Sequence, residues 1–206
     1  DLAWKKITPK MLLTEDAFHN AIVTDMALGG STNAIIHIIA MAGRAGIKLT
    51  LDQFDRISTQ VKVIANIRPC GDYVMEDFYD AGGILALLSQ VKSHLRLDCL
   101  TVSGKTLGEN IEGAEVFNDD VIRPLDRPLS KAGGTFVLRG NLAPDGAVIK
   151  PTAAEAHLLA HRGTAAVFCD YADLKARIHD ESLNLNSDHI IVLQNAGPIG
   201  APGIPE

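Results

Sequence analysis

Apolar residues recur every three or four positions over the first third of the chain, which is the spacing of helices with one buried face. A run of this kind covers residues 14–28, and Gly29–Gly30 follow it as a helix C-cap would. Ser31 or Thr32 suits the N-cap of a second helix, which the glycines at 43–46 end. The pattern therefore predicts two consecutive helices joined by a glycine-rich corner.

Capping motifs predict further helices. Thr50 and Gln53 form a T-x-x-Q capping box before LDQFDRIS, and Thr106 and Glu109 form a second box. Residues 76–95 read as two helices broken at Gly82–Gly83.

Short β-branched runs predict strands. Two such runs, VKVIANI (61–67) and CLTVSG (99–104), lie among the helices, and we expect the first to be a buried strand. Four more follow residue 132, namely TFVLRGN, AVIKP, TAAVFCD and HIIVLQN, with one helix, DLKARIHDE, capped by Asp170. The expected fold class is α/β, with helices concentrated in the first half and strands in the second.

The composition and the hydrophobic periodicity change over residues 114–132, which carry two prolines, mixed charges and weak periodicity. Such a segment is typical of a domain boundary or of a long surface connection. We expect one domain over 1–118 and a second over 119–206.

Composition narrows the class of protein. The chain has 206 residues, 47% of them hydrophobic and 21% charged, with a net charge of −6. These values exclude a disordered chain, a coiled coil and a collagen-like repeat. Because no basic cluster is present, neither nucleic acid nor an anionic membrane is an expected partner. The longest uncharged stretch, 26–43, is too polar to span a bilayer, and no signal peptide is recognised at the first residues.

The cysteines give no metal motif. Cys70, Cys99 and Cys169 are widely spaced and form no C-x-x-C pair, which favours unrelated thiols in a reducing compartment. Cys99 and Cys169 fall in the predicted strands, so we expect them in the core or a sheet. The expected location is cytoplasmic.

The candidate chemistry centres on the corner Gly29-Gly30-Ser31-Thr32-Asn33. A glycine-rich turn that opens a helix presents free N–H groups and a positive dipole end, which suit a carboxylate or phosphate. An ordinary helix–helix corner explains the same residues, and spacing alone favours it. His37, on the same helix, is expected to be a buried polar group rather than a catalyst.

Other polar positions leave alternatives open. Arg68–Tyr73 follow a predicted strand, with Glu76 and Asp77 opening a helix, and both a ligand-binding edge and a plain turn fit them. Gly104-Lys105-Thr106 lacks the rest of a P-loop, so a nucleotide site is rejected. Lys150 could reach an anion or simply be exposed. Glu206 ends a rigid Gly/Pro-rich loop, where it is a candidate ligand for a hard cation such as Mg²⁺, or merely the last residue.

Five blocks together resemble one family. They are GGSTNAIIHIIAMAG, RPCGDYVMEDFYDAGG, SGKTLGENI, GGTFVLRGNLAPDGAVIK and QNAGPIGAPGIPE. In this order they resemble the central part of the dihydroxy-acid and phosphogluconate dehydratases. MEDFYDAGG and GAPGIPE are more similar to the sugar-acid branch, which acts on arabinonate, xylonate and related aldonates.

The resemblance implies an α/β layered N-terminal domain and a β-barrel-like swivelling C-terminal domain, with the active site between them. It implies a hydro-lyase that turns a 2,3-dihydroxy acid into a 2-keto-3-deoxy acid. In the family an iron–sulfur cluster on three cysteines binds the leaving hydroxyl, Mg²⁺ holds the carboxylate and the 2-hydroxyl, and a serine takes the C2 proton.

Carried onto this chain, the resemblance makes Glu206 a Mg²⁺ ligand. It places the cluster cysteines, a carbamylated lysine and a further acidic ligand before residue 1, and the serine base after residue 206. No catalytic residue is thus expected within the chain, and the isolated chain should be inactive. Ser31, Thr32 and Asn33 are the expected substrate-binding residues.

Two alternatives remain open. The substrate could be a branched-chain dihydroxy acid, which needs an apolar wall where a sugar acid needs hydroxyl partners. The chain could also belong to a non-catalytic carboxylate-binding or assembly protein that keeps the scaffold without the chemistry. The expected partners are a small sugar acid and further copies of the protein in a dimer or tetramer.

Overall fold

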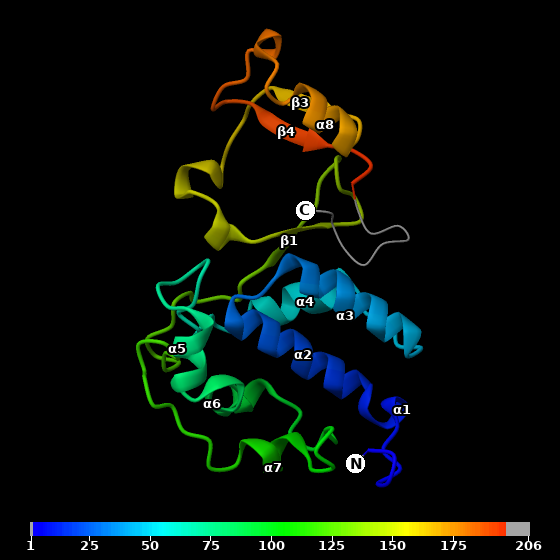
Figure 1. Cartoon of the computed structure of the whole chain (residues 1–206), viewed down its shortest axis with the longest axis vertical. Coiled ribbons are helices and arrows are strands. Elements are labelled where there is room, and N and C mark those ends of the chain that lie inside the picture. Colours follow the sequence, from blue (N-terminus) through cyan, green and yellow to red (C-terminus); the bar gives the residue numbers. More distant parts are fainter. Residues whose placement is uncertain (1, 197–206) are drawn as a thin grey trace. The chain divides into compact units, whose positions relative to one another are not determined.

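The computed structural model describes residues 2–196, which divide between two compact units, 1–153 and 154–206 (Figure 1). The first unit is mainly helical, and the second pairs two strands beside one helix. The expected boundary at residues 118/119 falls inside the first unit, because the segment after residue 119 pairs with residues 63–65 and adds Val121 and Ile122 to the helical core.

The first helices form as the periodicity predicts. A short α1 (Pro9–Leu12) precedes α2 (Glu15–Leu28), α3 (Thr32–Arg44) and α4 (Leu51–Ser58). Thr14 Oγ1 accepts the Ala17 amide hydrogen at the start of α2, and Gly29 ends that helix in the left-handed conformation, with φ 71°. Helix α2 packs against both α3 and α4.

The remaining helices of this unit also match their predicted positions. They are α5 (Met75–Asp80), α6 (Gly83–Gln90), the 3₁₀ turn η1 (Lys92–His94) and α7 (Leu107–Ile111). The capping boxes at Thr50/Gln53 and Thr106/Glu109 are both present. Each box satisfies amide groups at a helix start, so these short helices begin where the sequence indicates.

One aliphatic core lies beneath these helices. Its largest fully buried members include Phe54, Ile22, Met26, Ile35, Ile64, Leu87 and Ile122. They come from α2, α3, α4, α6 and the segments 61–67 and 121–122. The core therefore joins residues from both sides of the expected boundary.

The predicted strand at 61–67 was wrong in form, although not in burial. Val63, Ala65 and Ile67 are extended but make only isolated bridges, to Ser130, Ile122 and Tyr73. Pro124 and Pro128 interrupt the facing segment, and proline has no amide hydrogen to continue a ladder. The segment instead packs against the C-terminal end of α2, where the amides of Ile64 and Ala65 donate to the Ala27 carbonyl.

The predicted strand at 99–104 was wrong as well. This segment is a tight loop in which the Thr101 amide donates to the Lys105 carbonyl and the Gly104 amide donates to the Thr101 carbonyl. Gly104 has φ 82°, which bends the chain back before it can extend. Cys99 is consequently half-buried in this loop, and Cys169 is exposed just after a strand, so the expectation that both lie in the core or a sheet was also wrong.

The four later runs form strands, each shorter than its run. Strand β1 (Phe136–Leu138) pairs antiparallel with β2 (Ala147–Ile149), Phe136 facing Ile149. Two 3₁₀ turns follow, η2 (Pro151–Ala153) and η3 (Ala156–Leu158).

In the second unit, β3 (Ala165–Phe168) pairs parallel with β4 (Ile190–Leu193), Ala165 facing Ile190. Helix α8 (Tyr171–Arg177) and the turn η4 (Glu181–Leu183) connect them, and Asp170 caps α8 as predicted by accepting the Asp173 amide hydrogen. A strand–helix–strand crossover of this kind is the elementary α/β unit. The observed mixture of helices and small sheets is consistent with the expected α/β class. Across residues 2–196, no helix combines the length and apolarity that crossing a bilayer requires.

Candidate functional site

A pocket of about 510 Å³ opens beside the glycine-rich corner between α2 and α3. Its wall comes from the end of α2, the corner itself, the loop at 67–70, the first residue of α5 and the residue after β2. We call it the GGST pocket; its lining is Asp25, Leu28, Gly29, Gly30, Ser31, Thr32, Ile67, Arg68, Pro69, Cys70, Met75 and Lys150. Segments far apart in the sequence therefore meet at the motif that the sequence singled out.

Glycine is required at position 30 of the corner. A Cβ there would lie 1.8 Å from Asp25 Oδ1 and 2.7 Å from the Asp25 carbonyl oxygen. Ser31 then caps α3, its Oγ accepting the Asn33 amide hydrogen at 3.2 Å. The corner thus turns tightly and aims the first turn of α3 at the pocket.

Asp25 is the buried acid of this pocket. Its side chain is 8% exposed, and Oδ1 accepts the Ser31 amide hydrogen at 3.2 Å. Oδ2 has no hydrogen-bond partner among the described residues. Burial raises the pKa of Asp25 to about 6, against the smaller opposing effects of the Ser31 hydrogen bond and the charge of Lys150. Asp25 can therefore change charge near neutral pH.

Two cationic side chains line the same pocket. The half-buried Lys150 donates from Nζ to the Gly30 carbonyl at 2.6 Å, and Arg68 stands exposed on the loop at 67–70. Together with the positive end of α3, they make the pocket suited to an oxyanion such as a carboxylate. The hydroxyls of Ser31 and Thr32 can add hydrogen bonds to a hydroxylated ligand.

The predicted substrate-binding residues do not all lie in the pocket. Ser31 and Thr32 line it, whereas Asn33 is exposed and is not among its lining residues. Glu206, the predicted metal ligand, lies outside the described residues. Asp25 was missed by sequence reasoning; the one available signal was an acid within the apolar run AIVTDMALGG.

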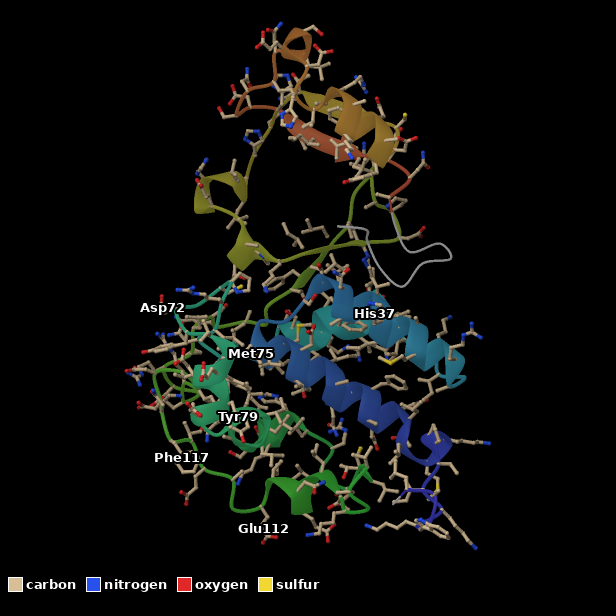
Figure 2. All side chains as sticks on the ribbon, in the orientation of Figure 1. His37, Asp72, Met75, Tyr79, Glu112 and Phe117 are labelled. Carbon is tan, nitrogen blue, oxygen red and sulfur yellow. The ribbon has the colours of Figure 1, made fainter. Side chains whose placement is uncertain are left out.

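The other polar candidates divide into exposed side chains, residues of the pocket wall and residues with a structural role. His37 lies on α3 (Figure 2) and is exposed, so the interpretation of it as a buried polar group was wrong. Asp77 Oδ2 accepts the Val74 amide hydrogen at the start of α5, and Glu109 does the same for Thr106 at α7. The loop at 68–73 divides: Arg68 and Cys70 line the GGST pocket, while the Asp72 amide donates to the side chain of buried Asn66.

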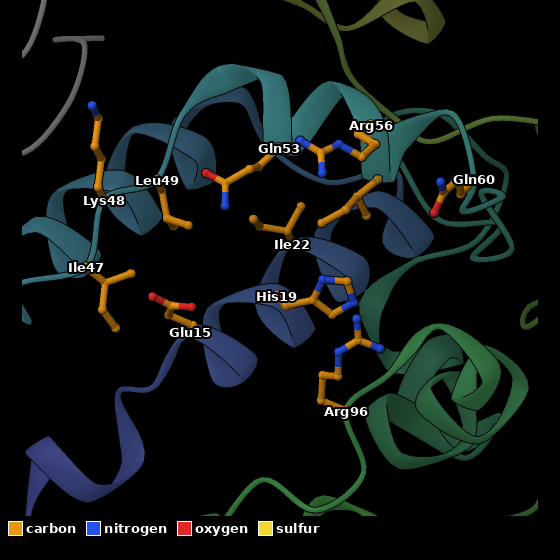
Figure 3. A pocket seen from close by; sticks show the side chains of 11 residues that line it. Glu15, His19, Ile22, Ile47, Lys48, Leu49, Gln53, Arg56, Gln60 and Arg96 are labelled. Carbon is orange, nitrogen blue, oxygen red and sulfur yellow. The ribbon is translucent and has the colours of Figure 1, made fainter.

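A second pocket, of about 310 Å³, lies between α2, α4 and the segment after η1 (Figure 3). Lys48, Arg56 and Arg96 stand at its exposed rim, and His19 Nε2 lies 2.9 Å from the His94 carbonyl oxygen. Arg96 also pairs with Asp16 at 3.7 Å. None of the residues proposed from the sequence to carry chemistry lines this pocket, so the GGST pocket is the better candidate.

Within residues 2–196, no three His, Cys, Asp or Glu side chains come close enough to hold a metal ion. The described residues thus do not themselves form a cluster or magnesium site.

Each half of the chain matches a model of a known protein family. The model of the dihydroxy-acid/6-phosphogluconate dehydratase N-terminal region matches residues 1–110, and the model of the C-terminal region matches residues 120–206.

Individual relatives agree with these matches. The chain is 48% identical to an L-arabinonate dehydratase of Rhizobium leguminosarum bv. trifolii, over 97% of this chain and 35% of the relative. It is 44% identical to a 6-deoxy-6-sulfo-D-gluconate dehydratase of Pseudomonas putida, over 100% of this chain and 36% of the relative. It is equally identical to a dihydroxy-acid dehydratase of Caldicellulosiruptor bescii, over 100% of this chain and 37% of the relative. The chain spans about a third of the length of these curated relatives, and it belongs to the dihydroxy-acid/6-phosphogluconate dehydratase family.

Proposed function

We propose that this chain is part of a hydro-lyase that dehydrates a sugar acid to its 2-keto-3-deoxy acid. The GGST pocket carries the proposal, because it combines cationic groups for a carboxylate with hydroxyl groups for a polyol. Two relatives whose names specify sugar-acid dehydratases support the choice of an aldonate.

In the proposed reaction the C2 proton and the C3 hydroxyl leave as water. The resulting enol tautomerises to the ketone, so atoms and charge balance without an oxidant. Ser31, Thr32 and Asn33 are proposed to contact the sugar acid. Ser31 and Thr32 can do so from their places in the pocket wall, whereas Asn33 would have to be reached by a ligand that extends along α3.

An iron–sulfur cluster and Mg²⁺ are proposed cofactors of the whole protein, with Glu206 as one Mg²⁺ ligand. When bound, they would supply Lewis-acid chemistry at the leaving hydroxyl and at the carboxylate. The side chains of residues 2–196 form no such site among themselves. The other ligands and the serine base are proposed to lie outside this chain.

The organisation of the whole protein is likewise a proposal. We propose domains that meet near residues 118/119, a barrel-like swivelling C-terminal domain, a dimer or tetramer, and a cytoplasmic location. The two family models, which match 1–110 and 120–206, support a division between residues 110 and 120.

A substrate panel tests the proposed function. We expect the full-length protein, purified anaerobically, to convert L-arabinonate or a related aldonate at least about tenfold more efficiently (kcat/KM) than 2,3-dihydroxyisovalerate, which corresponds to about 1.4 kcal/mol of transition-state binding. Formation of the 2-keto acid is followed as its semicarbazone. The reverse preference would favour the branched-chain alternative, to which the C. bescii relative points. Aldonate binding without any turnover would favour the non-catalytic alternative.

The isolated chain of 206 residues is expected to be inactive. It would lack the proposed cluster ligands and the proton-accepting serine, so aldonate incubated with it under anaerobic conditions with iron, sulfide and Mg²⁺ should yield no 2-keto acid. The full-length protein treated identically is the control. Turnover by the isolated chain at a rate comparable with the control would contradict the assignment of the chemistry to residues outside it.

A further inference from the structure

The donors of the GGST pocket are only partly used by the protein itself. Lys150 Nζ carries three hydrogens, and one contact, with the Gly30 carbonyl, is found for it among the described residues. In the first turn of α3, the Asn33 amide donates to Ser31 Oγ and the Ala34 amide to the Ser31 carbonyl. The Thr32 amide has no acceptor in the described part of the chain. Two kinds of donor, an ammonium and a helix amide, thus remain for a ligand.

One group in the pocket opposes an anion. Asp25 is more than nine-tenths buried, and its Oδ2 finds no donor among residues 2–196. An ionised carboxylate with an unsatisfied oxygen in such a place is costly. A proton on Oδ2 removes that cost, while Oδ1 keeps its hydrogen bond from the Ser31 amide. The protonated acid also ceases to repel a ligand oxyanion, so proton and anion favour one another at this site.

The other titratable groups of the pocket wall are cations and a thiol. Lys150 follows β2, and Arg68 and Cys70 lie on the loop at 67–70. The remaining lining residues of α2, α3 and α5 carry no titratable side chain. His37 of α3 is exposed and is not part of the wall. Asp25 is therefore the one carboxyl group among the lining residues.

We propose that Lys150 and the first turn of α3 bind an oxyanion of the ligand, and that Asp25 takes up a proton as the oxyanion binds. Lys150 and the Thr32 amide contact the ligand. Asp25 is a positioning residue: it accepts the Ser31 amide hydrogen, and its protonation removes a negative charge next to the bound anion. The inference rests on the proposed function for the choice of a sugar acid as ligand. The pKa of about 6 for Asp25 places the expected change between pH 5 and pH 7.

Calorimetric titration of the chain with L-arabinonate from pH 5 to pH 8 tests the proposal. Since Asp25 is protonated at pH 5 and ionised at pH 8, the Kd is expected to be about tenfold weaker at pH 8. L-arabinitol, which keeps the hydroxyls but has no charge, is expected to bind at least about tenfold more weakly than arabinonate at pH 5. Equal binding of the two compounds, or an arabinonate affinity independent of pH, would overturn the proposal.

Two variants separate the roles of the residues. Asp25→Asn preserves an oxygen for the Ser31 amide, and it should make the Kd constant from pH 5 to pH 8. Lys150→Met should weaken arabinonate binding about tenfold at every pH while leaving arabinitol unaffected. Two substitutions of exposed residues outside the GGST pocket are the matched controls: Asp80→Asn at the end of α5 and Lys48→Met. Both should leave the Kd for arabinonate and its pH dependence unchanged. If Asp25→Asn keeps the wild-type pH profile, the role of Asp25 is wrong.

Inorganic phosphate distinguishes the source of the oxyanion. Phosphate that competes with arabinonate and responds to Lys150→Met supports a general oxyanion site; arabinonate binding without phosphate competition supports a carboxylate site. The substrate panel on the full-length protein stands apart from these titrations. If the full-length protein turns over an aldonate but Lys150→Met leaves its arabinonate affinity unchanged, this inference alone is overturned. If the full-length protein turns over none of the acids, the proposed function is overturned.

Discussion

Replacing Gly134 by alanine is expected to destabilise the first unit by about 3 kcal/mol or more. A Cβ at this position would lie 2.5 Å from Gly29 Cα and 2.6 Å from the Gly29 carbonyl carbon. Both atoms are backbone, so no side-chain rotation can relieve the overlap, and the corner between α2 and α3 would have to move. The free energy of unfolding from urea titration, followed by circular dichroism at 222 nm, measures the effect.

Gly43→Ala is the matched control for this substitution. Gly43 lies within α3, and no heavy atom stands within 4 Å of the position its Cβ would occupy. Alanine there should be neutral or stabilise by up to about 1 kcal/mol, because it favours the helix. If Gly134→Ala behaves like Gly43→Ala, the close approach of residues 29 and 134 is wrong.

Phe54→Ala is expected to cost about 3–5 kcal/mol of unfolding free energy. Phe54 is 1% exposed and is among the largest fully buried side chains of the core. Its helix, α4, packs against both α2 and β1, so truncation opens a cavity where these elements meet. The same urea titration measures the loss. If the slope of the unfolding free energy against urea concentration is unchanged, the variant and the wild-type protein expose a similar surface area on unfolding.

Met41→Ala provides the comparison for a large side chain outside the core. Met41 lies on α3 and is 49% exposed, so its removal should change stability by no more than about 0.5 kcal/mol. Equal losses for Phe54→Ala and Met41→Ala would contradict the position assigned to the core.

Local signals explain which elements could be predicted. Thr14, Thr50, Thr106 and Asp170 each act within three residues of their own position, and each predicted helix start is present. The run at 61–67 was harder, because whether a β-branched segment becomes a strand depends on its partner. That partner lies more than fifty residues later and contains two prolines, which no local pattern around residue 64 reveals.

The residues of the site likewise fall into those that local sequence predicts and those that depend on long-range contacts. The corner at Gly29–Thr32 was predictable because glycines and a capping serine act locally. Asp25 and Lys150 gain their importance from contacts across the fold, the lysine through a carbonyl 120 residues away in sequence. Sequence alone assigns Lys150 either to solvent or to an anion, and only the folded pocket distinguishes these alternatives.

The close contact between Gly29 and Gly134 also bears on how the chain folds during synthesis. The corner between α2 and α3 is synthesised about a hundred residues before the segment that covers it. At ribosomal rates of about 5–20 residues per second, the corner stays uncovered for several seconds. A chain truncated at residue 118 would remain in that state permanently, because it lacks Gly134 and Lys150. For this protein, the earliest point at which the pocket can be complete is thus set by the synthesis of residue 150 rather than by the formation of the helices.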